Sequence, residues 1–376
     1  MRKVHITLVG GQPVPVYIGI KDDGQANTVV LVCSPESRVE AERIKAQFPK
    51  RNIILEECPP VALADIELLA MRLCEEYADC EKVLNLTSGT KLWSLTFFRV
   101  FHQDVNSRFV YIDQNNLITD ILAKSSHVGS INTLKRFELY GTPLTSFRTL
   151  DEYNADDLRV VREIEKARNI NRYDFQQLTG NKNLTDMPER DIITLDSGSQ
   201  LEYSFDEKWA LLKLNTESSP FIKELHCQHL PDILFNFGWF ELKTAAELHM
   251  NENVTNIWLN CEFADSGGNT KNEIDIIAEF GNRLLFVECK TMIRDSTDID
   301  KFRSALRNFS GTSSTGIFVT NDKPNAKTLQ RYEHAMEKCK DNGILTFNFS
   351  LWKNNPVNSP TLKEIVNEHL KLQNKR

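Results

Sequence analysis

The sequence predicts an α/β protein with two folded regions, an amino-terminal doubly wound sheet and a carboxyl-terminal α/β core. In residues 1 to about 125, short apolar strands alternate with amphipathic stretches, which is the element order of a mostly parallel sheet. A second alternation of the same kind starts near Phe221. The length of 376 residues is enough for two or three domains.

In the amino-terminal region each predicted strand is a short apolar run. The run Val-Val-Leu-Val-Cys, residues 29–33, is typical of a strand buried on both faces. In the stretch 37–48 apolar residues recur three or four positions apart, as they do in amphipathic helices. Serine and glutamate near its start are helix N-terminal signals. The expected strands are residues 4–9, 28–33, 52–55, 83–86, 109–112 and 117–122, and the expected helices are 37–48, 63–77 and 92–101.

Three loops at predicted strand ends are candidate ligand sites, because doubly wound sheets bind ligands beyond the carboxyl ends of their strands. They are residues 10–13, 34–37 and 85–91. The third loop holds three hydroxyls, a glycine and a lysine, groups that bind phosphate and let the backbone approach it. A capped strand-to-helix turn explains the serine and threonines equally well. The Walker A pattern is absent from the chain.

The middle of the chain has a weaker pattern. Residues 141–153 are expected to form a linker, 156–168 a charged helix and 181–200 an irregular polar loop. The chain is therefore expected to divide into residues 1–145, a linker and small connecting subdomain at 146–220, and residues 221–376.

The carboxyl-terminal region is organised around a predicted hairpin, residues 272–290, with its turn at Gly281–Asn282. A helix from 231 to about 250 and a strand at 257–263 precede the hairpin. The elements expected after it are a helix at 298–309, a strand at 316–319, a helix at 326–338 and a strand at 344–347.

The hairpin concentrates charge at the end of a very apolar strand. Glu288 and Lys290 are two residues apart and share a face, and a paired strand brings Asp275 beside them. Burying such groups is costly unless they have partners, and a divalent cation would be one. An edge hairpin with solvated charges is the alternative. Glu273 lies on the same predicted face as Asp275, and its role stays open.

Composition narrows the functional class. With 41% hydrophobic and 26% charged residues, the chain has the balance of a soluble globular protein. No run approaches the roughly 18 apolar residues that span a membrane, and no leader pattern is visible, so a cytoplasmic protein is expected. The eight cysteines lack paired spacing, which indicates reduced thiols and no zinc ribbon. A net charge of −7 permits a local basic groove but no general basic surface.

The carboxyl-terminal half, about residues 220–350, resembles the PD-(D/E)XK nuclease superfamily in Asp275, in Glu288-Cys289-Lys290 and in the upstream helical Glu241. The Asn-Glu-Ile-Asp form of residues 272–275 is a variant found in that superfamily. The resemblance implies a restriction-endonuclease-like core that cuts DNA or RNA with Mn²⁺ or Mg²⁺. The implied catalytic residues are Asp275, Glu288, Lys290 and Glu241, and the implied metal ligands are Asp275, Glu288, Glu241 and the Cys289 carbonyl.

The amino-terminal half is similar to the CARF domain, a Rossmann-like sensor of cyclic oligoadenylates in type III CRISPR defence. Residues 85–91 are close to one CARF motif, although Ser88 replaces its first glycine, and residues 10–13 match the first-strand loop. The combined resemblance is to dimeric ancillary nucleases with a single CARF domain, and it implies cyclic tetra-adenylate bound across a homodimer. The implied ligand-binding residues are Gly10, Gly11, Gln12, Pro13, Ser34, Thr87, Ser88, Gly89, Thr90 and Lys91.

Two other functions are compatible with the sequence. One is a CARF-type regulator whose second half binds DNA without cutting it. The other is a repair- or restriction-type nuclease in which the Rossmann-like half is structural. In addition, a CARF domain could degrade its own ligand, and this activity would be compatible with each of these functions.

Overall fold

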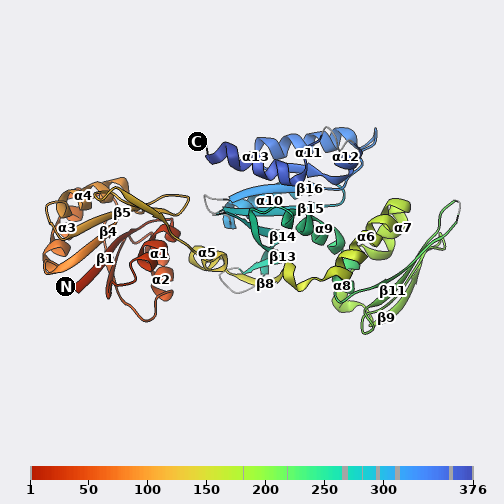
Figure 1. Ribbon diagram of the computed structural model, residues 1–376, viewed down its shortest axis with the longest axis horizontal. Helices are drawn as coiled ribbons and strands as arrows, with labels where there is room; N and C mark the ends of the chain where they lie inside the picture. The colour runs from red at the N-terminus through yellow and green to blue at the C-terminus, as the bar shows by residue number, and fades with distance from the viewer. Residues whose placement is uncertain are drawn as a thin grey trace. The chain divides into compact units, whose positions relative to one another are not determined.

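A computed structural model describes residues 2–180, 182–217, 219–264, 270–281, 283–293, 297–309, 314–354 and 359–374. The chain divides into two compact units (Figure 1). The first is Met1–Thr145 together with Phe263–Lys271, and the second is Ser146–Glu262 together with Asn272–Arg376.

The amino-terminal unit contains a seven-stranded sheet in the order β3-β2-β1-β4-β5-β6-β7. Strands β1 to β5 are parallel, and β6 and β7 are antiparallel additions at one edge. The prediction of a mostly parallel amino-terminal sheet is therefore confirmed. The strands are β1 (Arg2–Val9), β2 (Thr28–Cys33), β3 (Asn52–Glu57), β4 (Cys80–Asn85), β5 (Ser107–Ile112), β6 (Leu117–Asp120) and β7 (Ser125–Val128).

Helices cover both faces of this sheet, which explains why its strands are apolar without alternation. Helices α3 and α4 pack on one face, and α1, α2 and α5 pack on the other. Their bounds are α1 (Pro13–Asp22), α2 (Arg38–Ala46), α3 (Leu63–Glu76), α4 (Lys91–Phe101) and α5 (Thr133–Tyr140).

Helix α1 is absent from the sequence-based prediction because Pro13 and Pro15 resemble helix breakers. Pro13 is the first residue of α1, where a missing N–H costs no intrahelical hydrogen bond and the fixed φ of proline suits the helix. The first strand-end loop accordingly ends at Gln12.

The carboxyl-terminal unit is built around a six-stranded sheet in the order β17-β16-β15-β14-β13-β8. Strands β14 and β15 form the predicted antiparallel hairpin, and β15, β16 and β17 are parallel. Gly281 in its turn has a φ of 56°, which favours glycine, and Asn282 lies outside the described residues. The strands are β8 (Leu144–Thr149), β13 (Val254–Ala264), β14 (Thr270–Phe280), β15 (Arg283–Lys290), β16 (Ser314–Thr320) and β17 (Leu345–Asn348).

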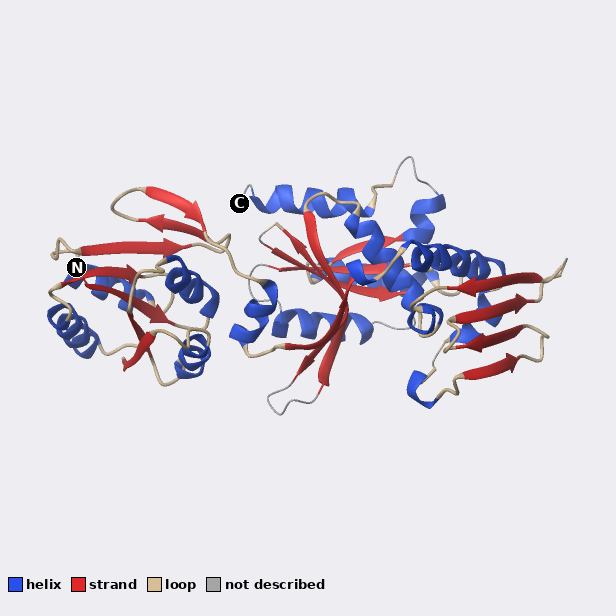
Figure 2. Cartoon of the chain, turned by 60° about the horizontal axis from the view of Figure 1, so that its bottom comes forward, coloured by secondary structure: helices blue, strands red, loops and turns tan. Residues whose placement is uncertain are grey.

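A second sheet of four antiparallel strands, in the order β12-β11-β10-β9, belongs to the same unit. Figure 2 shows these strands side by side. Their inward side chains share one hydrophobic core with α6, α7, α8 and the six-stranded sheet. The strands are β9 (Arg190–Thr194), β10 (Gln200–Ser204), β11 (Trp209–Leu214) and β12 (Phe221–His226).

Two sequence-based expectations for the middle of the chain are wrong. Residues 141–153 contain β8, an edge strand of the six-stranded sheet, instead of a linker. Residues 181–200 contain β9, which is mostly exposed at the edge of the four-stranded sheet and therefore has a polar sequence.

The remaining elements are mostly helices of the carboxyl-terminal unit. Helix α9, which carries Glu241, packs against β15, and α10 and α12 contact β16. The bounds are η1 (Leu150–Glu152), α6 (Ala155–Ile170), α7 (Arg172–Thr179), η2 (Leu184–Asp186), α8 (Leu230–Leu234), α9 (Gly238–His249), α10 (Thr297–Phe309), α11 (Leu329–Asp341), α12 (Phe349–Asn354) and α13 (Leu362–Asn374).

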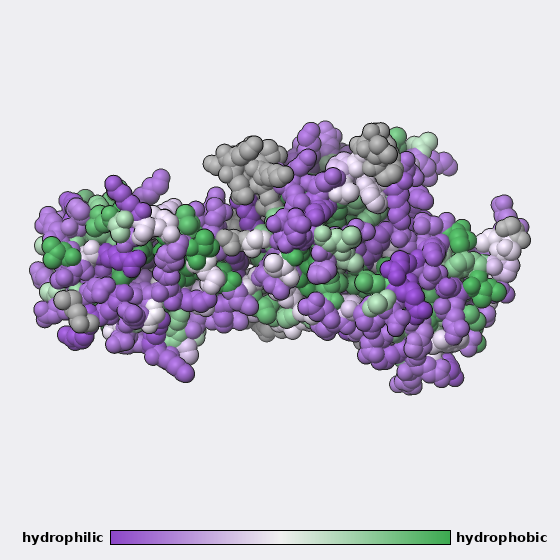
Figure 3. Space-filling view, viewed as in Figure 1, coloured by the Kyte–Doolittle hydropathy of each residue, from purple (hydrophilic) through white to green (hydrophobic). Residues whose placement is uncertain are grey.

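The surface is predominantly hydrophilic on the face shown in Figure 3, with small apolar areas scattered over both units. Among the helices of the described ranges, none combines the length and the apolar character needed to cross a membrane.

Candidate ligand cavity and acidic cluster

A cavity of about 340 Å³ lies at the carboxyl ends of the central strands of the amino-terminal unit. The parallel register places the ends of β1, β2 and β4 at the same edge of the sheet, so their loops meet there. The cavity is lined by Val9, Gly10, Gly11, Ser34, Glu36, Ser37, Glu40, Gly89, Thr90 and Trp93.

Half of the predicted ligand-binding residues line this cavity, namely Gly10, Gly11, Ser34, Gly89 and Thr90. The other five are neighbours in sequence of the lining residues, namely Gln12, Pro13, Thr87, Ser88 and Lys91. Pro13 is buried at the start of α1, whereas Gln12 is exposed, as is Lys91 at the start of α4.

The hydroxyls of Thr87 and Ser88 hold the loops together. The Ser88 hydroxyl accepts a hydrogen bond from the N–H of Gly10 at 3.0 Å and donates to the carbonyl of Gln12 at 3.4 Å. The Thr87 hydroxyl accepts from the N–H of Ile112 at 2.7 Å. Ser88 therefore fixes the first loop of the cavity wall, and Thr87 fixes its own loop to the end of β5.

Two glycines allow the first and third loops to approach each other. A Cβ on Gly10 would lie 2.8 Å from the backbone nitrogen of Gly89, closer than van der Waals contact allows. Gly89 has a φ of 78°, a conformation that other L-residues rarely adopt. Thr90 then caps α4 by accepting from the N–H of Trp93 at 3.2 Å. The amino end of α4 thus faces the cavity edge, where its dipole favours an anion.

Five lining residues are not among the ligand-binding residues that the resemblance implies: Val9, Glu36, Ser37, Glu40 and Trp93. Ser37 fastens the second loop, because its hydroxyl donates to the carbonyl of Val9 at 2.9 Å. Glu36 and Ser37 belong to the strand-end loop 34–37, which the sequence predicted as a candidate ligand site, and Val9 is the last residue of β1. Glu40 and Trp93 lie inside helices, and nothing in their local sequence distinguishes them.

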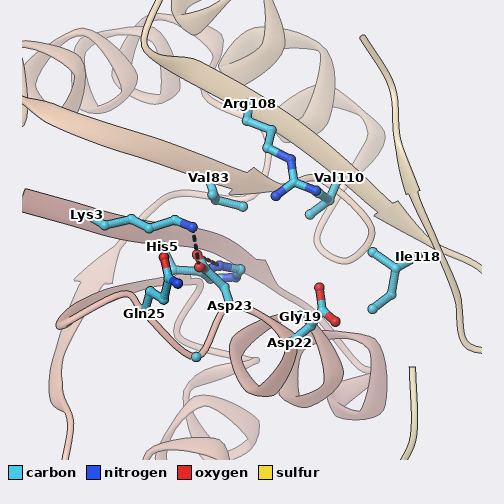
Figure 4. A pocket seen from close by; sticks show the side chains of 11 residues that line it. Lys3, His5, Gly19, Asp22, Asp23, Gln25, Val83, Arg108, Val110 and Ile118 are labelled. Carbon is cyan, nitrogen blue, oxygen red and sulfur yellow. Dashed lines mark hydrogen bonds and ion pairs between the residues drawn. The ribbon is translucent and has the colours of Figure 1, made fainter. Parts of the chain in front are cut away.

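A second cavity, of about 360 Å³, lies at the amino ends of β1, β4 and β5 (Figure 4). Asp23 accepts from His5 at 3.1 Å and pairs with Lys3 at 2.8 Å. Burial raises the pKa of Asp23, but these hydrogen bonds outweigh burial and hold the pKa below its ordinary value. Arg108 on the opposite wall pairs with Asp120. These ionic partners lie within the protein, so the cavity does not require a charged ligand.

The acidic cluster of the carboxyl-terminal unit forms where β14 and β15 separate. Their ladder ends at the pair Ile276 and Val287, and the Asp275 carboxylate then accepts from the N–H of Cys289 at 2.6 Å. The Lys290 ammonium lies 2.6 Å from Glu288 and 3.8 Å from Asp275. The three side chains expected to share a face are therefore brought together.

The fourth predicted residue, Glu241, belongs to the same electrostatic cluster. Burial raises the pKa of Glu241 well above its ordinary value, and the charges of Asp275 and Glu273 raise it further. The pKa of Glu288 is raised to about 8, again mainly by burial and then by Asp275. Burial disfavours the charged form of Lys290, but Asp275 and Glu288 outweigh it and raise its pKa. The cluster thus holds more carboxyl groups than one lysine can keep ionised.

The donor types of this cluster suit a hard divalent cation. Carboxylate and backbone carbonyl oxygens are the ligands that Mg²⁺ and Mn²⁺ take, and the buried thiol of Cys289, whose pKa burial raises, is not needed. The spacing is not that of a ready-made metal site. Among the described residues, no group of three or more histidine, cysteine, aspartate and glutamate side chains is arranged to hold an ion. Instead Glu288 is paired with Lys290.

Comparison with known proteins finds a family match for part of the chain. Residues 4–135 match the family model described as the Card1 CARF domain, so this part of the chain is similar to a CARF domain. No curated protein sequence matches the chain.

Three solved structures share the fold of nearly the whole chain. Can2 from Sulfobacillus thermosulfidooxidans, in complex with cyclic tetra-adenylate, is 17% identical with a TM-score of 0.67 over 97% of this chain and 99% of that chain. Protein VC1899 from Vibrio cholerae is 13% identical with a TM-score of 0.68 over 92% and 94%. A type III CRISPR defence DNA nuclease activated by cyclic oligoadenylate is 15% identical with a TM-score of 0.56 over 97% and 53%. At these identities the likeness concerns the fold.

Proposed function

We propose that this protein is a cytoplasmic, metal-dependent nuclease of type III CRISPR defence that cuts or nicks DNA or RNA when cyclic tetra-adenylate binds its CARF domain. One observation carries the proposal: a chain with a CARF domain also holds Asp275, Glu288 and Lys290 in one cluster. A carboxylate pair with a lysine is costly to bury and has no purpose in a domain that only binds DNA.

The activator would bind at the strand-end cavity. The backbone of Gly10, Gly11 and Gly89 allows close approach, the amino end of α4 favours phosphate, and the exposed Lys91 supplies charge. A ring of four nucleotides is large for a cavity of about 340 Å³ on one chain. The proposal therefore includes a homodimer that binds the ring across its two-fold axis.

In the acidic cluster Asp275, Glu288, the Cys289 carbonyl and Glu241 would hold Mn²⁺ or Mg²⁺. When bound, the cation polarises the phosphoryl oxygen and lowers the pKa of a water. Glu288 pairs with Lys290 through one carboxylate oxygen, so its other oxygen would serve for this ligation. The Lys290 ammonium would donate to the attacking water or to a phosphate oxygen, where it would offset the charge of the transition state.

The reaction is hydrolysis of one phosphodiester bond. The water oxygen forms a bond to phosphorus, the bond from phosphorus to the leaving sugar oxygen breaks, and that oxygen takes up a proton. Activation is a population shift, in which the activator binds more tightly to the dimer arrangement with accessible nuclease sites.

The test is cleavage of end-labelled single-stranded DNA, supercoiled DNA and RNA by the purified full chain. Each substrate is incubated with Mn²⁺ or Mg²⁺ and with no activator, cyclic tri-, tetra- or hexa-adenylate. We expect cleavage only with both metal and one cyclic oligoadenylate, with cyclic tetra-adenylate the most effective. Equal cleavage with and without every activator would overturn the sensing part of the proposal.

A CARF-type regulator that binds DNA without cutting it is the second candidate. The lack of a ready-made metal cluster among the described residues favours it. Tight DNA binding without cleavage of any substrate, in either metal, would select this function. A repair- or restriction-type nuclease instead predicts cleavage that no cyclic oligoadenylate changes.

A further inference from the structure

A second charged cluster, of opposite sign, lies in the carboxyl-terminal unit beyond the ends of β15 and β16. It contains four cationic side chains and two carboxylates, whereas the chain as a whole has a net charge of −7. Its members are Arg168, Arg172, Lys243, Lys353, Glu165 and Asp322.

Two guanidinium groups of this cluster share a single acceptor. Arg168 donates to the carbonyl of Thr291 at 3.1 Å, and Arg172 donates to the same carbonyl at 3.3 Å. Arg168 is 4% exposed and lies over the ring of Trp239 at 5.6 Å. Burial and, to a smaller extent, the nearby charge of Arg172 lower the pKa of Arg168 to about 10.

The carboxylates of the cluster offset the charge of this pair only in part. Asp322 lies 3.7 Å from Arg172, and it also accepts from the N–H of Ile293 at 3.0 Å. Glu165 forms ion pairs with two lysines, with Lys243 at 2.7 Å and with Lys353 at 2.6 Å. The two guanidinium groups at one carbonyl still repel each other, and a further anion beside them would reduce that cost.

The position of the pair connects it to the acidic cluster. Thr291 directly follows Lys290, and consecutive Cα atoms are about 3.8 Å apart. The Arg172 side chain is 32% exposed, so it is accessible to a ligand from solvent, whereas Arg168 is enclosed behind it.

We propose that Arg172, supported by Arg168, binds a backbone phosphate of the nucleic acid strand next to the phosphate that is cut. The inference rests on the proposed nuclease function and names the element that holds its substrate. A planar guanidinium binds two phosphate oxygens at once, which fixes the position of a strand more precisely than an ammonium does. Since phosphates carry no base identity, this contact positions DNA and RNA of any sequence.

The test is equilibrium binding of a labelled single-stranded DNA to the full chain with cyclic tetra-adenylate, with Ca²⁺ in place of Mn²⁺ to prevent cleavage, over a series of salt concentrations. Arg172→Gln is expected to weaken binding about tenfold at low salt and to reduce the slope of log affinity against log salt by about 0.7. Arg159→Gln is the matched control, because Arg159 is an exposed α6 arginine paired with Asp156 at 3.0 Å. This control is expected to keep both the parental affinity and the parental slope.

The outcomes separate a phosphate contact from a structural role. A lower melting temperature for Arg172→Gln with an unchanged salt slope would overturn the inference, since Arg172 would then only brace Thr291. Arg172→Lys is expected to keep the slope but lose part of the affinity. If the parent binds and cuts nucleic acid and Arg172→Gln behaves like the control, only this inference fails. If the parent neither binds nor cuts, the proposed function fails with it.

Discussion

The strand-end cavity and the acidic cluster hold their polar groups in opposite ways. Around the cavity the hydroxyls of Ser37, Thr87 and Ser88 are already hydrogen-bonded to the backbone of neighbouring loops. In the acidic cluster Asp275, Glu288 and Glu241 compete for the single charge of Lys290. The loops around the cavity are therefore fixed in place, whereas the cluster contains carboxyl groups whose ionisation is unfavourable and would be favoured by a cation.

The largest expected effect comes from removing the charges of the cluster. Glu288→Gln combined with Lys290→Ala is expected to lower the cleavage rate at saturating cyclic tetra-adenylate by about 10³-fold or more, because a metal ligand and a cation that stabilises the transition state are both lost. Calorimetry should find the affinity for the activator unchanged.

The matched control is Glu138→Gln with Lys135→Ala, which removes a Glu–Lys pair of the same 2.6 Å spacing from α5. We expect this variant to cut at nearly the parental rate. Parental cleavage by the cluster variant, in a preparation free of contaminating nuclease, would show that the chemistry lies elsewhere.

A smaller effect is expected at the cavity, where a single charge is removed from a prearranged site. Lys91→Ala should raise the concentration of cyclic tetra-adenylate needed for half-maximal cleavage about tenfold, the loss typical of one charge-assisted hydrogen bond. The rate at saturating activator should change less. Lys45→Ala, at an exposed position of α2, is the control. Identical activation curves for the two variants would remove Lys91 from the site.

The stability of the two units should also change with pH in opposite directions when a chelator removes metal. The pKa values of Glu241 and Glu288 are raised, the latter to about 8, so the folded protein binds more protons than the unfolded chain above pH about 4.3. Stability of the carboxyl-terminal unit should therefore fall as pH rises toward 8. The pKa of Asp23 is lowered, so its stabilising contribution is present above pH about 3.9 and is lost as pH falls through the folded value.

Calorimetry of the full chain measures this difference. Between pH 5 and 8 the melting transition that Mn²⁺ shifts should move down by about 2–4 °C for each kcal/mol lost, and added Mn²⁺ should remove the decline. Glu241→Gln with Glu288→Gln should flatten the pH dependence. A transition of the parent that stays constant without metal would mean that these carboxylates carry no unfavourable charge.

The acidic hairpin could be predicted from sequence because its determinants are local. Strand alternation alone places Glu288 and Lys290 on one face, and the hairpin pairing brings Asp275 to them. The approach of Glu241 depends on the packing of α9 against β15, which no pattern within residues 238–249 specifies. The parallel amino-terminal sheet was predictable for a similar reason, since each strand carries its own apolar run.

The elements that were missed depend on distant partners or on position within an element. Strand β8 joins β13, which lies far along the chain, and β9 is an exposed edge strand with little apolar sequence of its own. The Arg168–Arg172 pair could not be predicted from sequence either, because only the fold brings both guanidinium groups to the carbonyl of Thr291. Helix α1 was missed because prolines in a first turn look the same in sequence as prolines that end a helix.

The division of the chain also determines how the protein can be dissected. Residues Phe263–Lys271 belong to the amino-terminal unit, and the ring of Phe263 lies 5.2 Å from that of Phe137 on α5. A fragment that ends at Thr145 therefore lacks part of its own hydrophobic packing. Fusing this unit to another protein therefore requires a non-contiguous piece of polypeptide, since a fusion at residue 145 removes the contact between Phe263 and Phe137.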